Sequence, residues 1–539
     1  MRTKHYISLV LCTLSLCSLL PACQENIPQE QKDWENTTVY FNSSDEVSSE
    51  TYYIPSAGSV GDPLPFYDPV AKEFKILYLH NFEQNMEQTF HPLWGVRTTD
   101  AATYSSMGEV LPTGMAGEQD AALGTGCVIY DETDRLYYIY YTGERYKPVS
   151  DEDRQVVMRA TSPDFKTWTK DPLFRLRGAD YGYSSLNFRD PYIWHMDDGW
   201  HMIVSTKPMP VGSKVEEKDG VFAEFTSADL KTWTHQGRFT KMIWDRFLEC
   251  PNVFKMGEWW YLTYSDMSGF ERRVHYLKGR SIDDLKSATA PTWPDSKEGA
   301  LDSRAFYAGN TASDGSERYM WGWCPERRGK DNTDISADVE PKWGGSLVVH
   351  RLLQREDGTL YTAEVPAMRT KYAKESVLKA VKLFGQEEGN LSVADGVYTM
   401  KAYSSAVFNT LVYHNHLSMT VTTEAASNRF GISFVRGERE DGNEKYYSIM
   451  VCPDGSNNYI RFEEEQGKWE LKGGGSYAFP IPADRTYHID IYTDNSVMVM
   501  YINDVLTYTQ RIYNLPRNCW SVNCYEGGMT VKDIQVKQY

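Results

Sequence analysis

A repeat of about sixty residues fills the first two thirds of the chain and constrains its fold more than any other feature. Each unit holds two short apolar runs, such as residues 128–130 before 136–141 and residues 192–194 before 200–204. Alternating apolar and polar residues, broken by Asp, Gly and Pro, are typical of short β-strands. Units of a few strands cannot bury both faces alone and must stack on one another. We therefore expect a five-bladed β-propeller over residues 50–365.

The starts of the five units align at Asp62, Gly126, Asp190, Glu249 and Tyr307, in steps of 64, 64, 59 and 58 residues. In a propeller, the starts of the blades converge on the central axis. The alignment therefore predicts that three carboxylates, those of Asp62, Asp190 and Glu249, meet there although they lie far apart in sequence.

A second recurring signature, Ser-x-Asp-x-Lys-Thr-Trp, closes two of the units. It contains Asp164 in one copy and Asp229 in the next, 65 residues later, and Asp100 stands 64 residues before Asp164. Residues 281–285 form a degraded fourth copy. Asp favours turns and Trp favours packing between strands, so we interpret this signature as structural.

The remainder of the chain predicts a second all-β domain. Residues 366–390 are a connector, in which residues 375–384 favour a helical stretch. From residue 391 to 539, alternation returns in six runs, at 417–422, 430–435, 446–451, 459–462, 487–492 and 497–502. This spacing is typical of antiparallel strands in a β-sandwich. The predicted fold is all-β, a five-bladed propeller followed by a C-terminal β-sandwich.

Residues 1–23 have the pattern of a signal peptide, with a basic start, an apolar run and a small-residue end at Leu20-Pro21-Ala22-Cys23. This end resembles a bacterial lipobox, which implies that Cys23 carries a lipid, although a plain secretory signal is the alternative. Residues 24–49 are a polar linker. We expect an exported protein held on the bacterial outer membrane by its lipid anchor, at the cell surface or the periplasmic face.

Composition excludes several partners and cofactors. The chain has 56 Lys and Arg against 74 Asp and Glu, a formal net charge of −18, which disfavours nucleic acid. The six cysteines beyond Cys23 lack zinc-binding spacing, so no metal or cofactor is expected. Cys519 and Cys524 could form a disulfide. The acidic loop with Asp331, Asp334 and Asp338 is better explained as solvated than as a calcium site.

Three carboxylates at one axis suit the cleavage of a glycosidic bond. One carboxylic acid protonates the leaving oxygen, one carboxylate attacks or activates water, and a third can stabilise the oxocarbenium-like transition state. Asp-Pro pairs are common turns, so the shared position of Asp62 and Asp190 in the repeat carries this argument. Glu249 lies between apolar residues, which indicates a buried paired group or a raised pKa. Arg189 could hold Asp190 ionised.

Over residues 50–539 the chain resembles glycoside hydrolase family 32, the β-fructofuranosidases that include invertases, inulinases and levanases. Two motifs carry the resemblance, Arg189-Asp190-Pro191 and Glu249-Cys250-Pro251. Supporting matches are Trp94-Gly95, Asp302 with Phe306-Tyr307-Ala308, Trp321-Gly322-Trp323, and the segment from Asp494-Asn495-Ser496-Val497 to Ile502-Asn503-Asp504.

The resemblance implies a role for each candidate residue. Asp62 would be the nucleophile, Glu249 the general acid and then base, and Asp190 with Arg189 the stabiliser of the transition state and binder of fructose hydroxyls. Trp94 would line the sugar site. The implied reaction is cleavage of terminal or internal β-fructofuranosyl linkages in fructan, levan, inulin or sucrose, with retention of configuration and without a metal.

The chain also departs from the family's usual pattern, and other functions stay open. It reads Gly61-Asp62-Pro63-Leu64-Pro65 where the family usually has Asn-Asp-Pro-Asn-Gly, and residues 123–126 replace Phe-Ser-Gly-Ser. The walls of the fructose site therefore differ. One alternative is an inverting furanosidase of the related five-bladed class, such as an arabinofuranosidase. Another is a non-catalytic glycan-binding lipoprotein, in which some of the 37 Tyr and 15 Trp would stack on sugars.

Overall fold

The computed structural model describes most of the chain beyond its N-terminal segment. The described residues are 49–82, 91–145, 153–210, 213, 215–241, 247–266, 273–289, 301–327, 341–408, 411–426, 428–438, 444–454, 457–464, 477–512 and 519–539. The signal peptide, Cys23 and the acidic loop with Asp331, Asp334 and Asp338 lie outside these residues, so lipid anchoring stays a prediction. Within the described part, no helix is long and apolar enough to cross a membrane.

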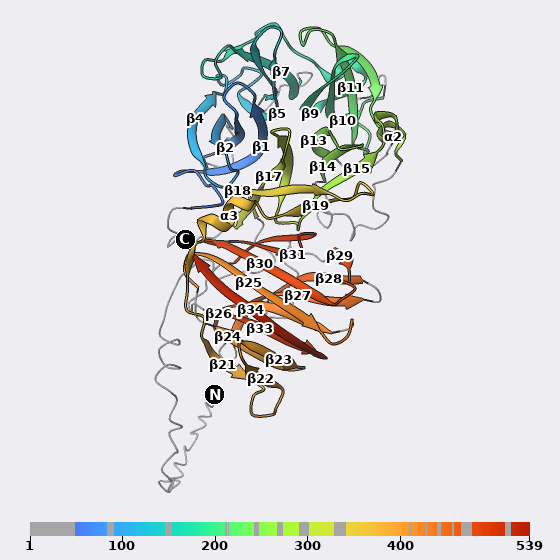
Figure 1. Ribbon diagram of the computed structural model, residues 1–539. Helices are drawn as coiled ribbons and strands as arrows, with labels where there is room; N and C mark the ends of the chain where they lie inside the picture. Colours follow the sequence, from blue (N-terminus) through green and yellow to red (C-terminus); the bar gives the residue numbers. More distant parts are fainter. Residues whose placement is uncertain are drawn as a thin grey trace, which may run out of the picture.

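The molecule consists of a β-propeller stacked on a β-sandwich, which confirms the predicted fold class (Figure 1). The blades, blue to yellow in Figure 1, surround a central axis, and the sandwich, orange to red, lies below them. Only short helices occur in the described part: the 3-10 helix η1 (Gly178–Tyr181), α2 (Ile282–Ser287) and α3 (Pro366–Lys371).

Each blade is an antiparallel sheet whose strands follow one another along the chain. Blade 1 contains β1 (Ser59–Asp68), β2 (Glu73–Asn81), β3 (Leu93–Thr98) and β4 (Ser105–Leu111). Blade 2 contains β5 (Ala122–Asp131), β6 (Leu136–Glu144), β7 (Gln155–Ser162) and β8 (Thr169–Lys170). Blade 3 contains β9 (Tyr183–Met196), β10 (Gly199–Pro208), β11 (Val221–Ser227) and β12 (Thr234–Arg238). Blade 4 contains β13 (Leu248–Met256), β14 (Trp259–Asp266) and β15 (Val274–Gly279). Blade 5 contains β16 (Tyr307–Ser313), β17 (Arg318–Arg327), β18 (Pro341–Gln354) and β19 (Leu360–Ala363).

The first strands of the blades form a closed ring around the axis. Strand β1 contacts β5, β5 contacts β9, β9 contacts β13, β13 contacts β16, and β16 contacts β1 again. The last blade also joins the first through pairing of β18 with β1 at Gly345 and Val60. Closure leaves each first strand buried between two neighbours, so residues on these strands are brought together from distant parts of the sequence.

The Ser-x-Asp signature forms the same turn in three blades, which confirms the structural interpretation. In each copy the Asp carboxylate accepts hydrogen bonds from the backbone N–H groups two and three residues later, as in Asp164 with Lys166 and Thr167 at 2.9 Å each. The residue after the Asp is left-handed, with φ of 60° at Phe165 and similar values at Ala101 and Leu230. In the fourth copy Ser281 and Asp284 instead form a capping box at the start of α2.

The C-terminal domain is a sandwich of two antiparallel sheets around one apolar core. The first sheet contains β20 (Lys374–Glu375), β22 (Leu391–Ala394), β23 (Val397–Lys401), β25 (His414–Thr423), β30 (Thr486–Asp494), β31 (Val497–Ile502), β32 (Leu506–Arg511) and β34 (Gly528–Gln538). The second contains β21 (Ala380–Phe384), β24 (Ser404–Phe408), β26 (Arg429–Glu438), β27 (Glu444–Asp454), β28 (Asn457–Glu464), β29 (Tyr477–Pro480) and β33 (Trp520–Glu526).

One expectation for this part of the chain was wrong, and one open possibility is not realised. Residues 375–384 form no helix: β20 ends at Glu375 and β21 pairs with β24, placing Leu383 opposite Ala406. Pairing with a sheet edge and contact with the sandwich core override the weak helical preference. Cys519 and Cys524 are both buried and do not form a disulfide with each other.

The sandwich is fixed to the propeller by β31, which is buried on both faces. Its alternate residues Val497, Val499 and Tyr501 belong to the apolar core of the propeller, whereas Met498 and Met500 belong to that of the sandwich. Successive side chains of a strand point to opposite faces of the sheet. One continuous apolar run thus joins the two domains.

A buried carboxylate beside this strand binds the start of the propeller. Asp494, 1% exposed, accepts hydrogen bonds from the backbone N–H groups of Thr51 at 2.6 Å and Tyr52 at 2.7 Å, and from that of Glu50 at 3.1 Å. His414 Nδ1 lies 3.0 Å from the other oxygen. Because several donors converge on one acceptor-only group, a neutral side chain that carries donors of its own cannot replace it well.

We expect Asp494→Asn to lower the free energy of unfolding by about 2–4 kcal/mol, because the amide NH2 would face backbone donors and the charge would be lost. Urea denaturation measures the change. Asp484→Asn, in an exposed turn where the carboxylate accepts from Thr486 N at 3.1 Å, is the control. Equal losses in the two variants would contradict the anchoring role.

Candidate active site

An extra residue interrupts strand pairing at the same place in the first strand of every blade. The register shifts between Val60 and Pro63, Gly124 and Gly126, Arg189 and Tyr192, Glu249 and Asn252, and Tyr307 and Asn310. Such β-bulges bend the strand and redirect side chains, and they are frequent beside active sites. Three residues within these bulges, Asp190, Cys250 and Ala308, have a left-handed backbone with φ between 50° and 59°.

The bulges refine the predicted alignment of the three acids. Judged by strand pairing, Glu249 is equivalent to Arg189 and Tyr307, each the last paired residue before its bulge. Asp190 is the first residue within its bulge and Asp62 the second. The acids therefore occupy three successive positions of one recurring bulge, not one position. The repeat brings the backbones together, and the one-residue offsets give each carboxylate a different surrounding.

Asp62 is held by two donors from neighbouring blades. Thr125 Oγ1 donates to Asp62 Oδ2 at 3.0 Å, and the indole N–H of Trp323 donates to Oδ1 at 2.8 Å. The carboxylate is partly exposed, while Thr125 and Trp323 are buried. Hydrogen bonds to both oxygens fix the plane of the group.

Glu249 is bonded through both carboxylate oxygens. Arg189 Nη2 and Nε lie 2.6 Å and 3.2 Å from Glu249 Oε1, and the hydroxyl of Tyr307 donates to Oε2 at 2.5 Å. The Arg189 guanidinium also lies over the ring of Phe247, 3.8 Å from its centroid. A guanidinium fixed by an ion pair and an aromatic face has little freedom to move.

Asp190 is the most deeply buried of the three acids, at 4% exposure. Its Oδ2 accepts the backbone N–H of Cys250 at 3.0 Å and lies 3.9 Å from Arg189 Nε. Burial raises the pKa of Asp190 to about 7; the charge of Arg189 opposes the shift, and the charges of Glu249 and Asp62 add to it. The three carboxylates thus lie close enough for their charges to interact, as the sequence predicted.

The same charges act on the thiol that follows Glu249. Burial raises the pKa of Cys250, and Asp62, Asp190 and Glu249 each raise it further. Cys250 also packs with Tyr307, Ala308 and Trp323 in a small apolar cluster. This buried apolar cluster borders the acids. Charges interact strongly beside apolar groups, because little water screens them there.

Several residues that contact the acids or Arg189 were not assigned a role from sequence. These are Thr125, Trp323, Tyr307, Gln155 and Asn187, of which the last two contact Arg189. A signal existed for Tyr307, which opens the fifth unit of the repeat, and for Thr125, which precedes the start of the second. A hydroxyl or indole donor looks like any core residue in a sequence, so its contact appears only in the folded ring.

The predicted sugar-site residue Trp94 lies on β3, two strands away from the axis. Its ring stacks on His80 with centroids 4.3 Å apart, and Phe82 packs against its edge. No contact between Trp94 and the three acids is present in the described residues. Its role in sugar binding stays a prediction.

The structure explains one departure from the family's usual sequence. A Cβ atom at Gly61 would lie 2.1 Å from the indole of Trp343, so the ring occupies the space that an Asn side chain would need. Trp343 stacks on His91 with centroids 4.3 Å apart and is 37% exposed. The indole ring of Trp343 therefore fills the space that the missing side chain of Gly61 leaves beside Asp62.

A cluster that could ligate a metal lies elsewhere, where the sandwich meets the end of the propeller. Within the described residues, Glu364, His416 and Asp490 offer ligand atoms within 4.8 Å of one another. Arg369 forms ion pairs with Glu364 and Asp490, the latter at 3.2 Å, and His416 Nε2 lies 2.7 Å from Asp490. Arginine already balances both carboxylates, so the cluster is better explained as an ion-pair network than as a metal site.

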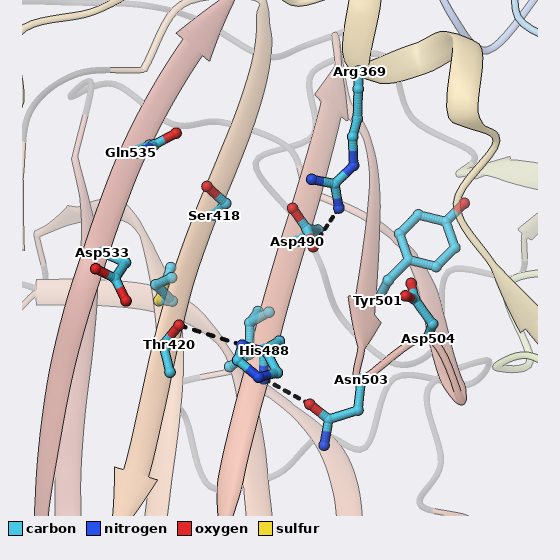
Figure 2. A pocket seen from close by; sticks show the side chains of 12 residues that line it. Arg369, Ser418, Thr420, His488, Asp490, Tyr501, Asn503, Asp504, Asp533 and Gln535 are labelled. Carbon is cyan, nitrogen blue, oxygen red and sulfur yellow. Dashed lines mark hydrogen bonds and ion pairs between the residues drawn. The ribbon is translucent and has the colours of Figure 1, made fainter.

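Figure 2 shows the pocket that borders this network on the outer face of the first sandwich sheet. It has a volume of about 440 Å³ and is lined by polar side chains from β25, β30 and β34. Thr420 contacts His488 at 3.4 Å, and the Asn503 side chain accepts the backbone N–H of His488 at 2.7 Å. These contacts stabilise the hairpin of β30 and β31. The pocket lining includes none of the three acids at the propeller axis.

A five-bladed propeller with converging carboxylates, an arginine paired to one of them, and a C-terminal sandwich define a glycoside hydrolase architecture. The family model for the N-terminal domain of glycosyl hydrolases family 32 matches residues 53–363. The model "GH32, BT1760-like, C-terminal domain" matches residues 358–536. The chain belongs to glycosyl hydrolases family 32.

Similarity to individual proteins is distant in sequence and close in fold. A sucrose-6-phosphate hydrolase of Zymomonas mobilis is 22% identical over 453 residues, 79% of each chain. One of Vibrio alginolyticus is 27% identical, but the match covers only 35% of this chain and 39% of that protein. Fructan 1-exohydrolase IIa of Cichorium intybus has a TM-score of 0.69 at 14% identity, covering 92% of this chain and 98% of that one.

We expect Asp190→Asn to stabilise the protein more at pH 8 than at pH 4. The raised pKa means that folded Asp190 keeps its proton up to about pH 7, whereas the unfolded residue loses it near pH 4. Wild-type stability therefore falls as the pH rises between these values, and Asn, which does not ionise, removes this loss. The gain should be on the order of 2–4 kcal/mol, because one pKa unit is worth about 1.4 kcal/mol.

Thermal or urea unfolding at the two pH values measures this difference. Asn tolerates the left-handed backbone at position 190, where φ is 59°. Asp395→Asn is the matched control, because Asp395 is also left-handed, with φ of 49°, but is exposed. A gain that is equal at both pH values would contradict the burial of a protonatable carboxylate at the axis.

Proposed function

We propose that the protein hydrolyses β-fructofuranosyl linkages of fructans or sucrose-like oligosaccharides by a retaining double displacement. The observation that carries this proposal is the unequal bonding of the three acids. Asp62 accepts hydrogen bonds from two neutral donors, and Glu249 is bonded to Arg189 and Tyr307. Asp190 is buried and accepts the backbone N–H of Cys250. Cleavage of a glycosidic bond uses two carboxyl groups with different roles, and a third can stabilise the positive charge of the transition state.

Asp62 fits the role of nucleophile. The donors Thr125 and Trp323 orient its carboxylate, and its partial exposure leaves it accessible to a sugar. A carboxylate that is ionised and fixed in place can attack the anomeric carbon with little reorganisation. The bond from that carbon to the leaving oxygen breaks as the bond to the carboxylate oxygen forms.

Glu249 fits the role of general acid and then general base. In the first step its proton passes to the leaving oxygen, and in the second it takes a proton from the water that attacks the fructosyl-enzyme. Tyr307 donates to one oxygen and Arg189 to the other, so the carboxyl plane stays fixed through both steps. Asp190 and Arg189 would bind ring hydroxyls and stabilise the oxocarbenium-like transition state.

The similar proteins support a furanoside substrate. Those described above are sucrose-6-phosphate hydrolases and a fructan 1-exohydrolase, and a variant of the latter has been solved in complex with 1-kestose, with a TM-score of 0.68 to this chain. An inverting furanosidase remains the competing reaction class, since it also uses converging carboxylates on a five-bladed propeller. Stereochemistry and substrate choice separate the two.

We expect Glu249→Gln to lower kcat/KM on inulin, levan or sucrose by about 10³-fold, because the amide cannot deliver a proton. The same variant should bind the substrate nearly unchanged, as measured by isothermal titration calorimetry. Glu258→Gln, in the exposed hairpin of the same blade, is the control and should keep full activity. If Glu249→Gln were as active as the parent, the catalytic role would be refuted.

A panel of inulin, levan, sucrose and an arabinan, with the products separated by chromatography, tests the substrate class. Fructose as the only product would indicate exo-action, and fructan oligosaccharides would indicate endo-action. Release of arabinose with no release from any fructoside would replace the proposed substrate with the competing one.

Retention predicts that the first product seen by NMR is β-fructofuranose, before mutarotation sets in. Asp62→Asn should abolish turnover, and an acid-quenched digest of the active enzyme should contain a fructosyl ester on the peptide with Asp62. An α-anomer as first product would overturn the double displacement in favour of inversion.

A further inference from the structure

Two side-chain amides accept hydrogen bonds from Nη1 of Arg189, the nitrogen that does not bond to Glu249. Its Nη1 donates to Asn187 Oδ1 at 2.9 Å and to Gln155 Oε1 at 3.2 Å. Both amides therefore present their oxygen, and not their NH2 group, to the guanidinium. Arg189 itself is the cation that pairs with Glu249 and lies beside Asp190.

Each amide is in turn bonded to a carboxylate farther from the axis. Asn187 Nδ2 donates to both oxygens of Glu216, at 3.0 Å and 2.8 Å, and Gln155 Nε2 donates to Glu144 Oε2 at 3.0 Å. A carboxylate can only accept, so it binds the NH2 end of the amide and fixes the oxygen toward Arg189. Rotation of either amide by half a turn would place NH2 against the guanidinium and leave a donor facing a donor.

Glu216 is built into its position, although it lies outside the strands. It follows β10 and accepts from Ser184 Oγ at 2.6 Å and from Lys207 Nζ at 3.0 Å. Burial opposes its ionisation, but the hydrogen bonds from Ser184, Asn187 and Lys207 prevail and lower the pKa of Glu216. Its side chain is 20% exposed, so the group lies at the surface end of a chain of contacts that ends at the axis.

We propose that Glu216 is a positioning residue for the cleavage reaction, acting on Glu249 and Asp190 through Asn187 and Arg189. By fixing the oxygen of Asn187, it keeps Nε and Nη2 of Arg189 directed at Glu249. Glu144 and Gln155 form a parallel branch to the same guanidinium, so losing one branch loosens Arg189 without releasing it. This inference rests on the proposed function, since it gives Glu249 its catalytic role.

The test is Glu216→Gln, compared with Glu217→Gln. Glu217 is the adjacent, exposed residue, 3.8 Å from Arg238, and its variant should behave like the wild type. For Glu216→Gln we expect a 5- to 20-fold fall in kcat with KM changed less than twofold. The ground-state contacts to the sugar remain, whereas the geometry needed in the transition state is lost.

The pH profile supplies a readout that a merely structural role would not move. The carboxyl group of Asp190 is faced by Arg189, Glu249, Asp62 and the Cys250 N–H, and Arg189 is the only cation among these four. A loosened Arg189 opposes protonation of Asp190 less, so the acidic limb of the kcat/KM profile should move to higher pH in Glu216→Gln. An unmoved profile would overturn the proposal.

Combination with Arg189→Lys shows whether the effect passes through the arginine. Lysine lacks the fork that joins Asn187 to Glu249, so Glu216→Gln should have almost no further effect on kcat in that background. Additive losses would mean that Glu216 acts by another route. Asn187→Ser, which removes the amide but leaves Glu216 in place, should reproduce the single-variant phenotype.

Unfolding keeps this inference separate from the proposed function. The pH dependence of the unfolding temperature reports the proton on Asp190 without any turnover, and Glu216→Gln should move it to higher pH. A wild type inactive on every fructoside, with this shift present, would refute the proposed function and keep the positioning. An active wild type, with no such shift in Glu216→Gln, would keep the proposed function and refute the positioning role of Glu216.

Discussion

The bulge in the innermost strand of each blade is the constraint on which the rest of the site depends. It inserts one residue at the same place in five strands that surround one axis, and it does so where the strands contact one another. An unbroken strand would point successive side chains to opposite faces of its blade. The bulge instead turns consecutive residues toward the axis, so that Arg189 and Asp190 both reach the site. Left-handed backbone at Asp190 and Cys250 is the local cost of this turn.

Charge balance at the axis follows from that geometry. Three carboxylates are brought together with one guanidinium, and a raised pKa and hydrogen bonds from neutral donors offset the deficit of positive charge. Asp190 responds by a raised pKa, Asp62 by accepting from Thr125 and Trp323, and Glu249 by pairing with Arg189. Three chemically similar groups are thus placed in three different surroundings.

The sandwich contributes to this arrangement by bracing the ring. Asp302, one of the residues that resemble the family, accepts from Thr509 N at 2.8 Å and contacts His350 at 2.8 Å, at the junction of the domains and not at the active site. Arg511 reaches across to the backbone oxygen of Cys324 at 3.0 Å. Family resemblance in these positions therefore reflects docking of the two domains, whereas Arg189 and Glu249 pair with each other at the propeller axis.

Much of the fold could be read from the sequence because its determinants are local. Alternation of apolar and polar residues marked the strands. The Asp of each Ser-x-Asp turn accepts hydrogen bonds from residues close to it in sequence. The number of repeat units predicted the number of blades. The segment 375–384 was misread because its partner, β24, lies outside any local window. Likewise, Asp302 and Tyr307 both matched the family's sequence pattern. Only their contacts in the folded protein show that Asp302 joins the two domains and that Tyr307 donates to Glu249.

By itself, the sequence determined the all-β architecture and the family, and it predicted that three acids converge, because strand periodicity and short motifs are written in consecutive residues. Only the tertiary structure decided that the acids occupy successive positions of a bulge, that Trp343 fills the space beside Gly61, and that Asn187 links Glu216 to Arg189. Those facts depend on which oxygen faces which donor across blades some sixty residues apart. Contacts of this kind are set by ring closure and packing, and no pattern in the chain encodes them separately.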